Sequence, residues 1–246
     1  MRKSEIKIIG AIPARFGSSR FKGKVLADIS GKPMIQWVYE RTVKSTLLDD
    51  VFVVVDDPRV EECVQAFGGK VVMTGSHFQS GTDRIASMLG DIEADIVVNI
   101  QGDQPLIDPQ MIDETVQPML DNSDILMSTL KREIGKDDFD DTGVVKVVTD
   151  EQNYALYFSR SLIPFPRDSE NLHVYEHVGL YAYRRDFLLT YSEWPQGYLE
   201  KLESLEQLRV LEKGYKIYVA ETSCDASAGI SVDVPADIDK VLKFLK

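Results

Sequence analysis

The chain has 246 residues, of which 43% are hydrophobic and 28% charged, and its net charge is −12. This composition fits a globular protein with a sizeable core and excludes a disordered chain. The excess of acids argues against nucleic-acid binding, which needs a basic face. No apolar run reaches the ~18 residues of a membrane span, and the first residues lack a signal peptide's apolar core. We therefore expect a cytoplasmic protein with no membrane partner.

The first predicted element is a buried strand over residues 6–12, which ends at Pro13. The loop over residues 14–24 then carries four basic side chains and no acid. Arginine forks, lysines and free backbone N–H groups in such a loop suit a polyphosphate. Because the loop matches neither the Walker A pattern nor the dinucleotide-binding glycine pattern, a solvated basic loop is the alternative interpretation.

Strands and helices alternate through the next part of the chain, which is typical of an α/β fold with a parallel sheet. The patterns predict an extended segment, a turn, a helix, a strand, a helix and a strand, over residues 24–29, 30–33, 34–47, 49–57, 59–67 and 70–74.

A polar turn over residues 75–84 leads into the next helix. Ser80 or Thr82 would cap a helix that begins near Asp83, and Arg84 would lie in its first turn. A cation there interacts unfavourably with the helix dipole unless an anion lies beside it. Arg84 is therefore a candidate ligand contact, and an exposed arginine on a solvated turn is the alternative.

The predicted strand over residues 95–100 runs into a turn that contains Asp103, and a helix follows over 109–120. Ligands in open α/β sheets bind at the carboxyl ends of the strands. Asp103 would share that edge with the basic loop, where a carboxylate beside a polyphosphate can hold Mg²⁺. An ordinary turn residue before Pro105 is the alternative.

The second half begins with a strand over residues 125–134, an acidic loop over 135–143 and a hairpin within 144–164. We expect a strand from residue 173, with His177 facing a cleft, and a helix from about residue 185. The remaining predicted elements are a helix over residues 198–213, a strand over 216–220, and, within 231–245, an extended entry to a closing helix with Pro235 in its first turn. The two cysteines, Cys63 and Cys224, have no metal-ligand spacing, and we expect buried or idle thiols.

Seven collinear blocks cover nearly the whole chain and resemble one known family, the cytidylyltransferases that activate 3-deoxy-D-manno-octulosonate (Kdo), called CMP-Kdo synthetases. The blocks are IPARFGSSRFKGKVL, SGTDR, VNIQGDQPLID, ALYFSRSLIP, HVGLYAYR, LEQLR and ISVDVPADIDKV.

The resemblance implies a Rossmann-like three-layer α/β/α fold of the nucleotide-diphospho-sugar transferase type. It implies one domain over residues 1–246, with a smaller β excursion at about 125–190 that serves the sugar pocket and a homodimer. The implied reaction joins CTP to a 2-keto-3-deoxy sugar acid, Kdo, and releases pyrophosphate, with Mg²⁺ as cofactor. The product would serve lipopolysaccharide or capsule biosynthesis.

The resemblance also implies roles for single residues. Arg15, Ser19, Arg20 and Lys24 match the loop that grips CTP, and its three basic side chains are implied to be catalytic. Asp103 and Asp233 match the magnesium ligands and are implied to be catalytic as well. The sugar pocket corresponds to Arg84, Gln101, Arg160, His177, Tyr181, Glu206 and Gln207.

Four positions depart from the family pattern. Lys22 stands for a proline, Val55 for a threonine, Gln104 for an acid and Gly143 for an asparagine. None removes a proposed phosphate or metal ligand, but the sugar remains open between Kdo, its 8-amino analogue and another 2-keto acid sugar. A nucleotidyltransferase for sugar phosphates and a nucleotide-binding module without turnover are the alternatives outside this reaction.

Overall fold

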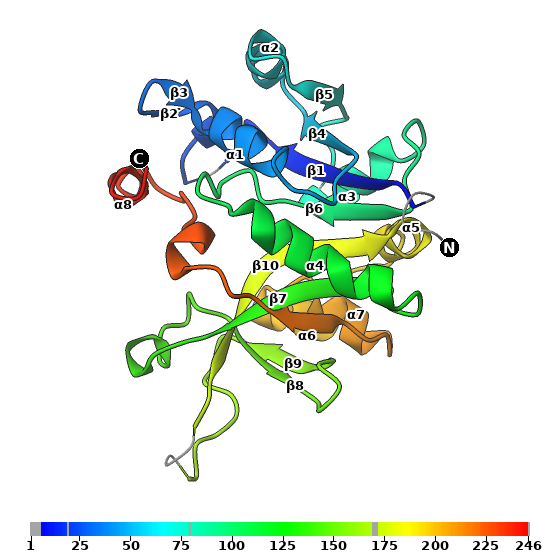
Figure 1. The fold of residues 1–246 in the computed structure, drawn as a ribbon, viewed down its shortest axis with the longest axis vertical. Helices are drawn as coiled ribbons and strands as arrows, with labels where there is room; N and C mark the ends of the chain where they lie inside the picture. Colours follow the sequence, from blue (N-terminus) through cyan, green and yellow to red (C-terminus); the bar gives the residue numbers. More distant parts are fainter. Residues whose placement is uncertain (1–5, 19, 79, 169–171, 246) are drawn as a thin grey trace.

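The structure is a computed structural model that describes residues 6–18, 20–78, 80–168 and 172–245. Within these residues, nine strands form one sheet, and β1 (Ile8–Ala14) lies near its centre. It pairs in parallel with β4 (Asp50–Val55) and with β6 (Ile96–Asn99), and β4 pairs in parallel with β5 (Lys70–Met73). The strand order changes direction at β1, which lies between β4 and β6 (Figure 1), so a ligand is expected at the ends of β1 and β6.

The other half of the sheet contains the antiparallel pairs. The strand β10 (Tyr175–Arg184) runs antiparallel to β6 and to β7 (Met127–Glu133), and β11 (Tyr218–Glu221) lies parallel to β7 at the edge. As predicted, the segment after the acidic loop is a hairpin, formed by β8 (Lys146–Thr149) and β9 (Ala155–Ser159). It branches from β10 and extends away from the main sheet in Figure 1.

Helices cover both faces of the sheet and make three layers, which confirms the predicted fold class. One face packs against α1 (Met34–Thr42), α2 (Pro58–Ala66), α4 (Pro109–Asp121) and α8 (Asp237–Leu242). Each of these helices places apolar side chains in one core cluster with the strands.

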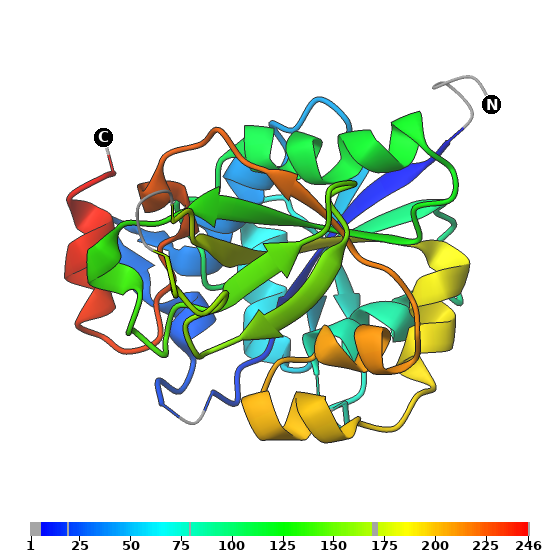
Figure 2. The ribbon, with the colours of Figure 1, turned by 90° about the horizontal axis from the view of Figure 1, so that it is seen from below.

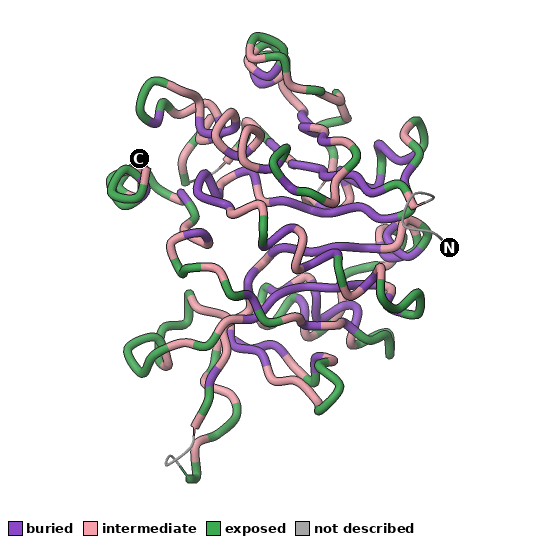
Figure 3. Tube along the Cα trace, viewed as in Figure 1, coloured by how far each residue is buried: buried purple, intermediate pink, exposed green. Residues whose placement is uncertain are grey.

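The opposite face packs against α3 (Gly81–Met88), α5 (Arg185–Ser192) and α7 (Leu208–Glu212), with α6 (Tyr198–Glu203) beside them. Figure 2 shows α4 above the sheet and the helices α5 to α7 below it. The strands between them are buried over most of their length (Figure 3).

Short elements complete the description. The two strands β2 and β3 pair with each other beside α1, and three 3₁₀ turns, η2, η3 and η4, lie in loops. The strands are β2 (Asp28–Ile29) and β3 (Lys32–Pro33). The turns are η2 (Lys24–Leu26), η3 (Lys136–Asp138) and η4 (Ala226–Gly229). None of the helices in the described part of the chain is both long and apolar enough to cross a membrane.

The predicted helix over residues 198–213 is wrong as a single element, because it breaks into α6 and α7. Ser204 adopts the left-handed conformation at the break, with φ of 54°. Arg209 donates from Nε and Nη2 to both carboxylate oxygens of Glu200, at 2.7 and 2.6 Å. Nine residues of continuous helix would separate these positions by about 13 Å, so the buried ion pair requires the break.

Smaller differences occur at element ends. The strand β1 continues through Pro13 to Ala14, and α1 ends at Thr42 rather than near residue 47. The closing helix begins at Asp237, after Pro235. Both cysteines are free, as expected. That the whole chain is one domain stays a prediction.

Candidate active site

The basic loop after β1 is held in a compact turn by its own backbone. Phe16 O accepts hydrogen bonds from the N–H groups of Ser18 and Gly23, at 3.0 and 2.9 Å. Gly23 has φ of 70°, and a Cβ there would lie 2.9 Å from the Phe16 ring, so only glycine fits. Phe16 N–H also donates to Asp56 Oδ1 at 3.2 Å, which ties the loop to the end of β4.

Lys24 lies at the end of this loop, between the two predicted metal ligands. Its Nζ donates to Asp103 Oδ2 at 2.7 Å and to Asp233 Oδ1 at 3.3 Å. Arg20 Nη2 donates to the same Asp233 oxygen at 2.8 Å. The structure therefore brings together four predicted residues from three distant segments of the chain.

The C-terminal segment reaches the site through backbone contacts. Val232 N–H donates to Asp103 O at 2.9 Å, and Val232 O accepts from Lys24 Nζ at 3.1 Å. The next residue, Asp233, is held by Asp237, whose Oδ2 accepts from the N–H groups of Asp233 and Val234 at 3.0 Å each. A Cβ on Gly102 would lie 2.8 Å from Pro13 O, so glycine allows the turn after β6 to approach β1.

A cavity of about 370 Å³ opens over this cluster. Its lining includes eight of the predicted site residues: Arg15, Arg20, Lys24, Arg84, Gln101, Asp103, Glu206 and Asp233. Four of these side chains are cationic and three are carboxylates, in a chain whose net charge is −12. The cavity, called here the basic cavity, therefore has a local excess of positive charge, which favours a polyphosphate.

Arg84 is almost completely buried and pairs with a carboxylate. This anion offsets the unfavourable interaction of a cation with the helix dipole in the first turn of α3. Arg84 Nη2 donates to Asp56 Oδ2 at 2.8 Å, and Nη1 donates to Thr74 Oγ1 at 2.8 Å. Ser80 is the cap of α3, because its Oγ accepts from Asp83 N–H. Asp56 thus links α3 to the basic loop.

A second cavity of about 400 Å³ adjoins the first and is called here the polar cavity. Among the predicted residues it is lined by Gln101, His177, Tyr181, Glu206 and Gln207. Gln101 and Glu206 line both cavities. Since Gln101 Nε2 donates to Gly179 O at 3.1 Å, its side chain is fixed at the boundary between them.

His177 is held in one orientation inside the polar cavity. Its Nε2 lies 3.0 Å from Thr129 Oγ1, and its Nδ1 lies 3.5 Å from Gln207 Nε2. Because the Gln207 amide nitrogen can only donate, His177 Nδ1 accepts and Nε2 carries the proton. Burial lowers the pKa of His177 to about 3, so the ring is neutral near pH 7.

Glu206 contacts Thr82, whose Oγ1 donates to Glu206 Oε1 at 2.8 Å. Burial raises the pKa of Glu206, and the hydrogen bond from Thr82 opposes this shift. Burial also raises the pKa of Tyr181 well above its usual value, so its hydroxyl stays protonated and can donate.

One predicted residue lies elsewhere, and another is outside the described part of the chain. Arg160 is absent from the linings of both cavities over the described residues, and its Nε and Nη1 donate to Glu203 O and Thr142 O. These bonds hold the loop before β8 against the end of α6. Ser19 lies outside the described residues, so its predicted contact with CTP is untested.

The sequence patterns did not single out Asp56 or Thr82 as site residues. Asp56 follows a buried strand at its carboxyl end, which is the signal that could have revealed it. Thr82 carried only its alternative role as a helix cap, and its contact with Glu206 spans 124 residues of sequence.

A divalent metal fits this donor set only in part. Within the described ranges, no group of three or more His, Cys, Asp or Glu side chains could hold a metal ion. Asp103 and Asp233 nevertheless converge on one cation, the Lys24 ammonium. Two carboxylates suit Mg²⁺ when phosphate oxygens complete its octahedral coordination.

Known proteins with similar sequences were found over nearly the whole chain. A family described as cytidylyltransferase matches residues 9–217. The chain is 51% identical to a 3-deoxy-manno-octulosonate cytidylyltransferase of Geotalea uraniireducens, covering 98% of this chain and 100% of the relative. It is 52% identical to the enzyme of the same name from Geobacter metallireducens, covering 98% of each.

Solved structures are similar to this chain as well. CMP:2-keto-3-deoxy-manno-octonic acid synthetase, complexed with CTP, superposes with a TM-score of 0.93 at 46% identity, covering 97% of this chain and 98% of the other. The 4-diphosphocytidyl-2C-methyl-D-erythritol synthase of Anaerococcus prevotii has a TM-score of 0.65 at 11% identity, covering 99% and 98%, and shares the fold.

Proposed function

The chain belongs to the cytidylyltransferase family, and from this premise we propose that it forms CMP-Kdo and pyrophosphate from CTP and Kdo. The observation that carries the proposal is the pair of adjoining cavities. The basic cavity suits a triphosphate, the polar cavity suits the hydroxyl groups of a sugar, and Gln101 and Glu206 line both. The two substrates can therefore meet at these two side chains.

The reaction is a substitution at the α-phosphorus of CTP. The anomeric oxygen of the sugar forms the new bond to phosphorus and loses its proton to solvent. The bond from the α-phosphorus to the bridging oxygen breaks, and the electron pair leaves with pyrophosphate. Arg15, Arg20 and Lys24 are proposed to stabilise the charge that develops on this leaving group.

The polar cavity is proposed to bind and orient the sugar. Neutral His177 and the Gln207 amide are held together by their mutual contact, and Tyr181 lines the same cavity. Fixed neutral donors and acceptors suit the hydroxyl groups of a sugar. Holding the two substrates in one geometry supplies much of the catalysis of such a transfer.

Asp103 and Asp233 are proposed to hold Mg²⁺ when CTP is bound. When bound there, the ion neutralises phosphate charge and orients the substrates. Lys24 would then exchange its carboxylate partners for phosphate oxygens, which it can do because a lysine is a flexible point charge.

The proposal also includes a setting for the reaction. The enzyme would act in the cytoplasm, where CTP is available, and supply an activated sugar to lipopolysaccharide or capsule assembly.

We include a homodimer, supported by the exposed apolar side chains of Leu156 and Phe165 on and after the hairpin, which are 62% and 83% accessible. Light scattering on purified protein tests the dimer, and a monomer mass at micromolar concentration would contradict it.

The reaction itself is tested by pyrophosphate release from CTP and Mg²⁺ with Kdo, 8-amino-Kdo, sialic acid or no sugar. Release with Kdo well above the other three is the expected result. Release with only the amino sugar would retain the reaction and change the substrate. CTP binding without release for any sugar would overturn the proposed function.

A further inference from the structure

Thr82 is buried at the boundary of the two cavities and connects three elements. It lies in α3 with 1% of its surface exposed. Its Oγ1 donates to Glu206 Oε1 at 2.8 Å and accepts from Asn99 Nδ2, at the end of β6, at 3.2 Å. This hydroxyl lines neither cavity, so it reaches a ligand only through Glu206.

The direction of these hydrogen bonds follows from the groups themselves. The Asn99 amide nitrogen can only donate, and an ionised carboxylate can only accept. With Glu206 ionised, the Thr82 hydroxyl donates its proton to Glu206 Oε1. Turning the Asn99 amide over would place its oxygen against a hydroxyl whose proton is already engaged, so the amide orientation is fixed as well.

Glu206 depends on this contact for its position. Among the described residues, its carboxylate receives no hydrogen bond other than the one from Thr82. The charged groups around it are Arg209, which attracts it, and Asp83 and Glu200, which repel it. Glu206 also lies within the break between α6 and α7, where no regular helix constrains it.

We propose that Thr82 is a positioning residue for the sugar acid: it fixes Glu206 at the boundary of the two cavities and leaves Oε2 available to a sugar hydroxyl. The inference rests on the proposed function, because the sugar is the ligand of that oxygen. Asn99 holds Thr82 in place, since its amide donates a hydrogen bond to the Thr82 hydroxyl oxygen.

The test replaces Thr82 with valine, which keeps the shape and removes the hydroxyl. We expect kcat/KM for Kdo to fall about 10- to 100-fold, the cost of losing a hydrogen bond to a charged group, while KM for CTP changes less than about threefold. Thr82→Ser should restore most of the activity, because serine supplies the same hydroxyl. A double-mutant cycle with Glu206→Gln should show strong coupling, since Thr82 acts through Glu206.

Thr115→Val is the matched control. Thr115 is also fully buried in a helix, and its hydroxyl donates only to Met111 O within α4, outside both cavities. This variant should keep wild-type kinetics. Should Thr82→Val fail to fold by circular dichroism, Asn99→Ala replaces it, with a smaller loss in the same direction.

The outcomes distinguish a failure of the proposed function from a failure of the positioning role of Thr82. If wild-type protein releases no pyrophosphate with any sugar acid, the proposed function fails and this inference fails with it. If wild type is active and Thr82→Val matches it, or if serine does not rescue valine, only the positioning role is overturned.

Discussion

At the scale of single residues, the charge balance of the site depends on Lys24. Its side chain is 13% exposed, and its ammonium separates two carboxylates that would otherwise face each other. A like-charge pair without a cation is destabilising. The ammonium therefore acts as a counter-ion for the carboxylates when no metal is bound.

We expect Lys24→Ala to lower the free energy of unfolding without metal by about 1 kcal/mol, because the paired carboxylates are partly solvated. Added Mg²⁺ should raise the melting temperature of this variant more than that of wild type, since the metal replaces the lost cation. Turnover should fall about 100-fold. Differential scanning calorimetry with EDTA or Mg²⁺ measures the first two effects.

Lys32→Ala is the control for this experiment. Lys32 also pairs with a carboxylate, Glu40, at 2.7 Å, but the pair is 38% exposed on each side and lies outside both cavities. It should show no change in the response to Mg²⁺. An equal response to Mg²⁺ in all three proteins would contradict the role assigned to Lys24.

His177 provides a prediction about pH. Its pKa of about 3 means that the folded protein keeps the ring neutral, whereas the unfolded chain protonates it near pH 6.5. Acidification below about pH 6.5 should therefore lower the free energy of unfolding, by up to about 1.4 kcal/mol per pH unit, until the folded pKa is reached. His177→Gln should remove this part of the pH dependence.

Nuclear magnetic resonance can follow the same group directly. The imidazole signals of His177, assigned by their loss in His177→Gln, should stay constant between about pH 5 and 8. A titration midpoint near pH 6.5 would contradict the lowered pKa of His177.

At the scale of elements, the segment between η4 and α8 determines where Asp233 lies. Asp237, at the start of α8, accepts from the backbone N–H groups of Asp233 and Val234. The hydrogen bond from Lys240, together with these backbone bonds, lowers the pKa of Asp237 to about 2. Asp237 is therefore ionised at neutral pH and can hold this turn.

We expect Asp237→Ala to weaken the activation by Mg²⁺ about 10-fold, because residues that orient a metal ligand typically cost this much when removed. The measurement is the Mg²⁺ concentration for half-maximal pyrophosphate release. The contribution of Asp237 to stability should be present above about pH 4 and lost as the pH falls toward 2.

Asp239→Ala tests whether charge alone explains the result. Asp239 lies in the first turn of the same helix, with an exposed side chain. The Asp239→Ala substitution removes the same charge but keeps the hydrogen bond between Asp237 and the Asp233 N–H group. It should therefore leave the Mg²⁺ dependence unchanged. Equal effects of the two variants would attribute the loss to net charge rather than to the turn.

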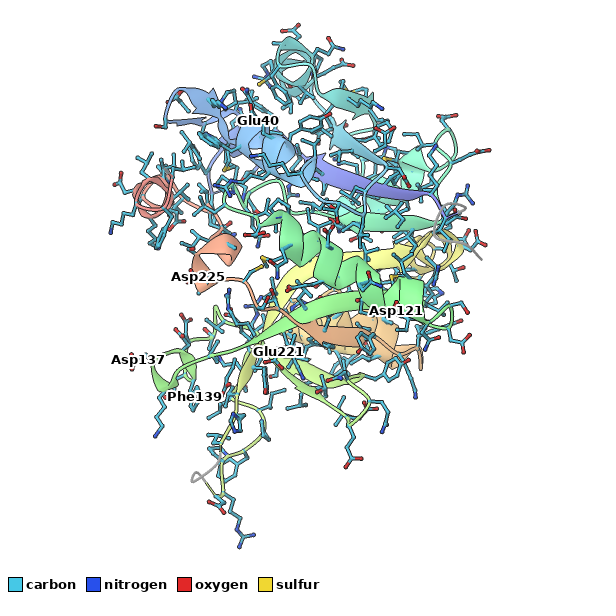
Figure 4. The ribbon with its side chains drawn as sticks, viewed as in Figure 1. Glu40, Asp121, Asp137, Phe139, Glu221 and Asp225 are labelled. Carbon is cyan, nitrogen blue, oxygen red and sulfur yellow. The ribbon has the colours of Figure 1, made fainter. Side chains whose placement is uncertain are left out.

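At the scale of the whole molecule, acids outnumber basic residues by twelve, whereas cations outnumber carboxylates in the lining of the basic cavity. Figure 4 labels exposed carboxylates on separate elements, among them Asp121 at the end of α4, Asp137 in η3, Glu221 in β11 and Asp225 before η4. The cavity instead collects cations from segments that are distant in sequence. A bound nucleotide would therefore stabilise the tertiary structure rather than one local element.

We expect CTP with Mg²⁺, at 100 times its dissociation constant, to stabilise the protein by about 2.7 kcal/mol. For a chain of this size that corresponds to a rise of roughly 5–10 °C in melting temperature. Asp103→Asn should keep the wild-type melting temperature without ligand within a few degrees and lose the part of the shift that requires Mg²⁺. The same Mg²⁺-dependent shift in this variant would remove Asp103 from the metal site.

Much of the fold could be predicted from the sequence because its signals are local. Apolar runs bounded by turn residues predicted the parallel strands, a cap at Ser80 or Thr82 predicted the start of a helix, and two short strands around a turn predicted the hairpin of β8 and β9. The basic loop and Asp103 could be placed near each other from a general rule about strand ends. Specific roles for site residues came from resemblance to a family, because side-chain types alone left alternatives open.

By itself, the sequence determined the order of strands and helices and the concentration of positive charge after β1, since both depend on neighbours within a few residues. Only the tertiary structure decided which side chains meet. Lys24 contacts Asp233 across 209 residues, Thr82 contacts Glu206 across 124, and Arg160 holds backbone carbonyls rather than lining either cavity. Such contacts depend on strand order and on the break at Ser204, which are set by packing and ion pairing between distant segments rather than by local periodicity.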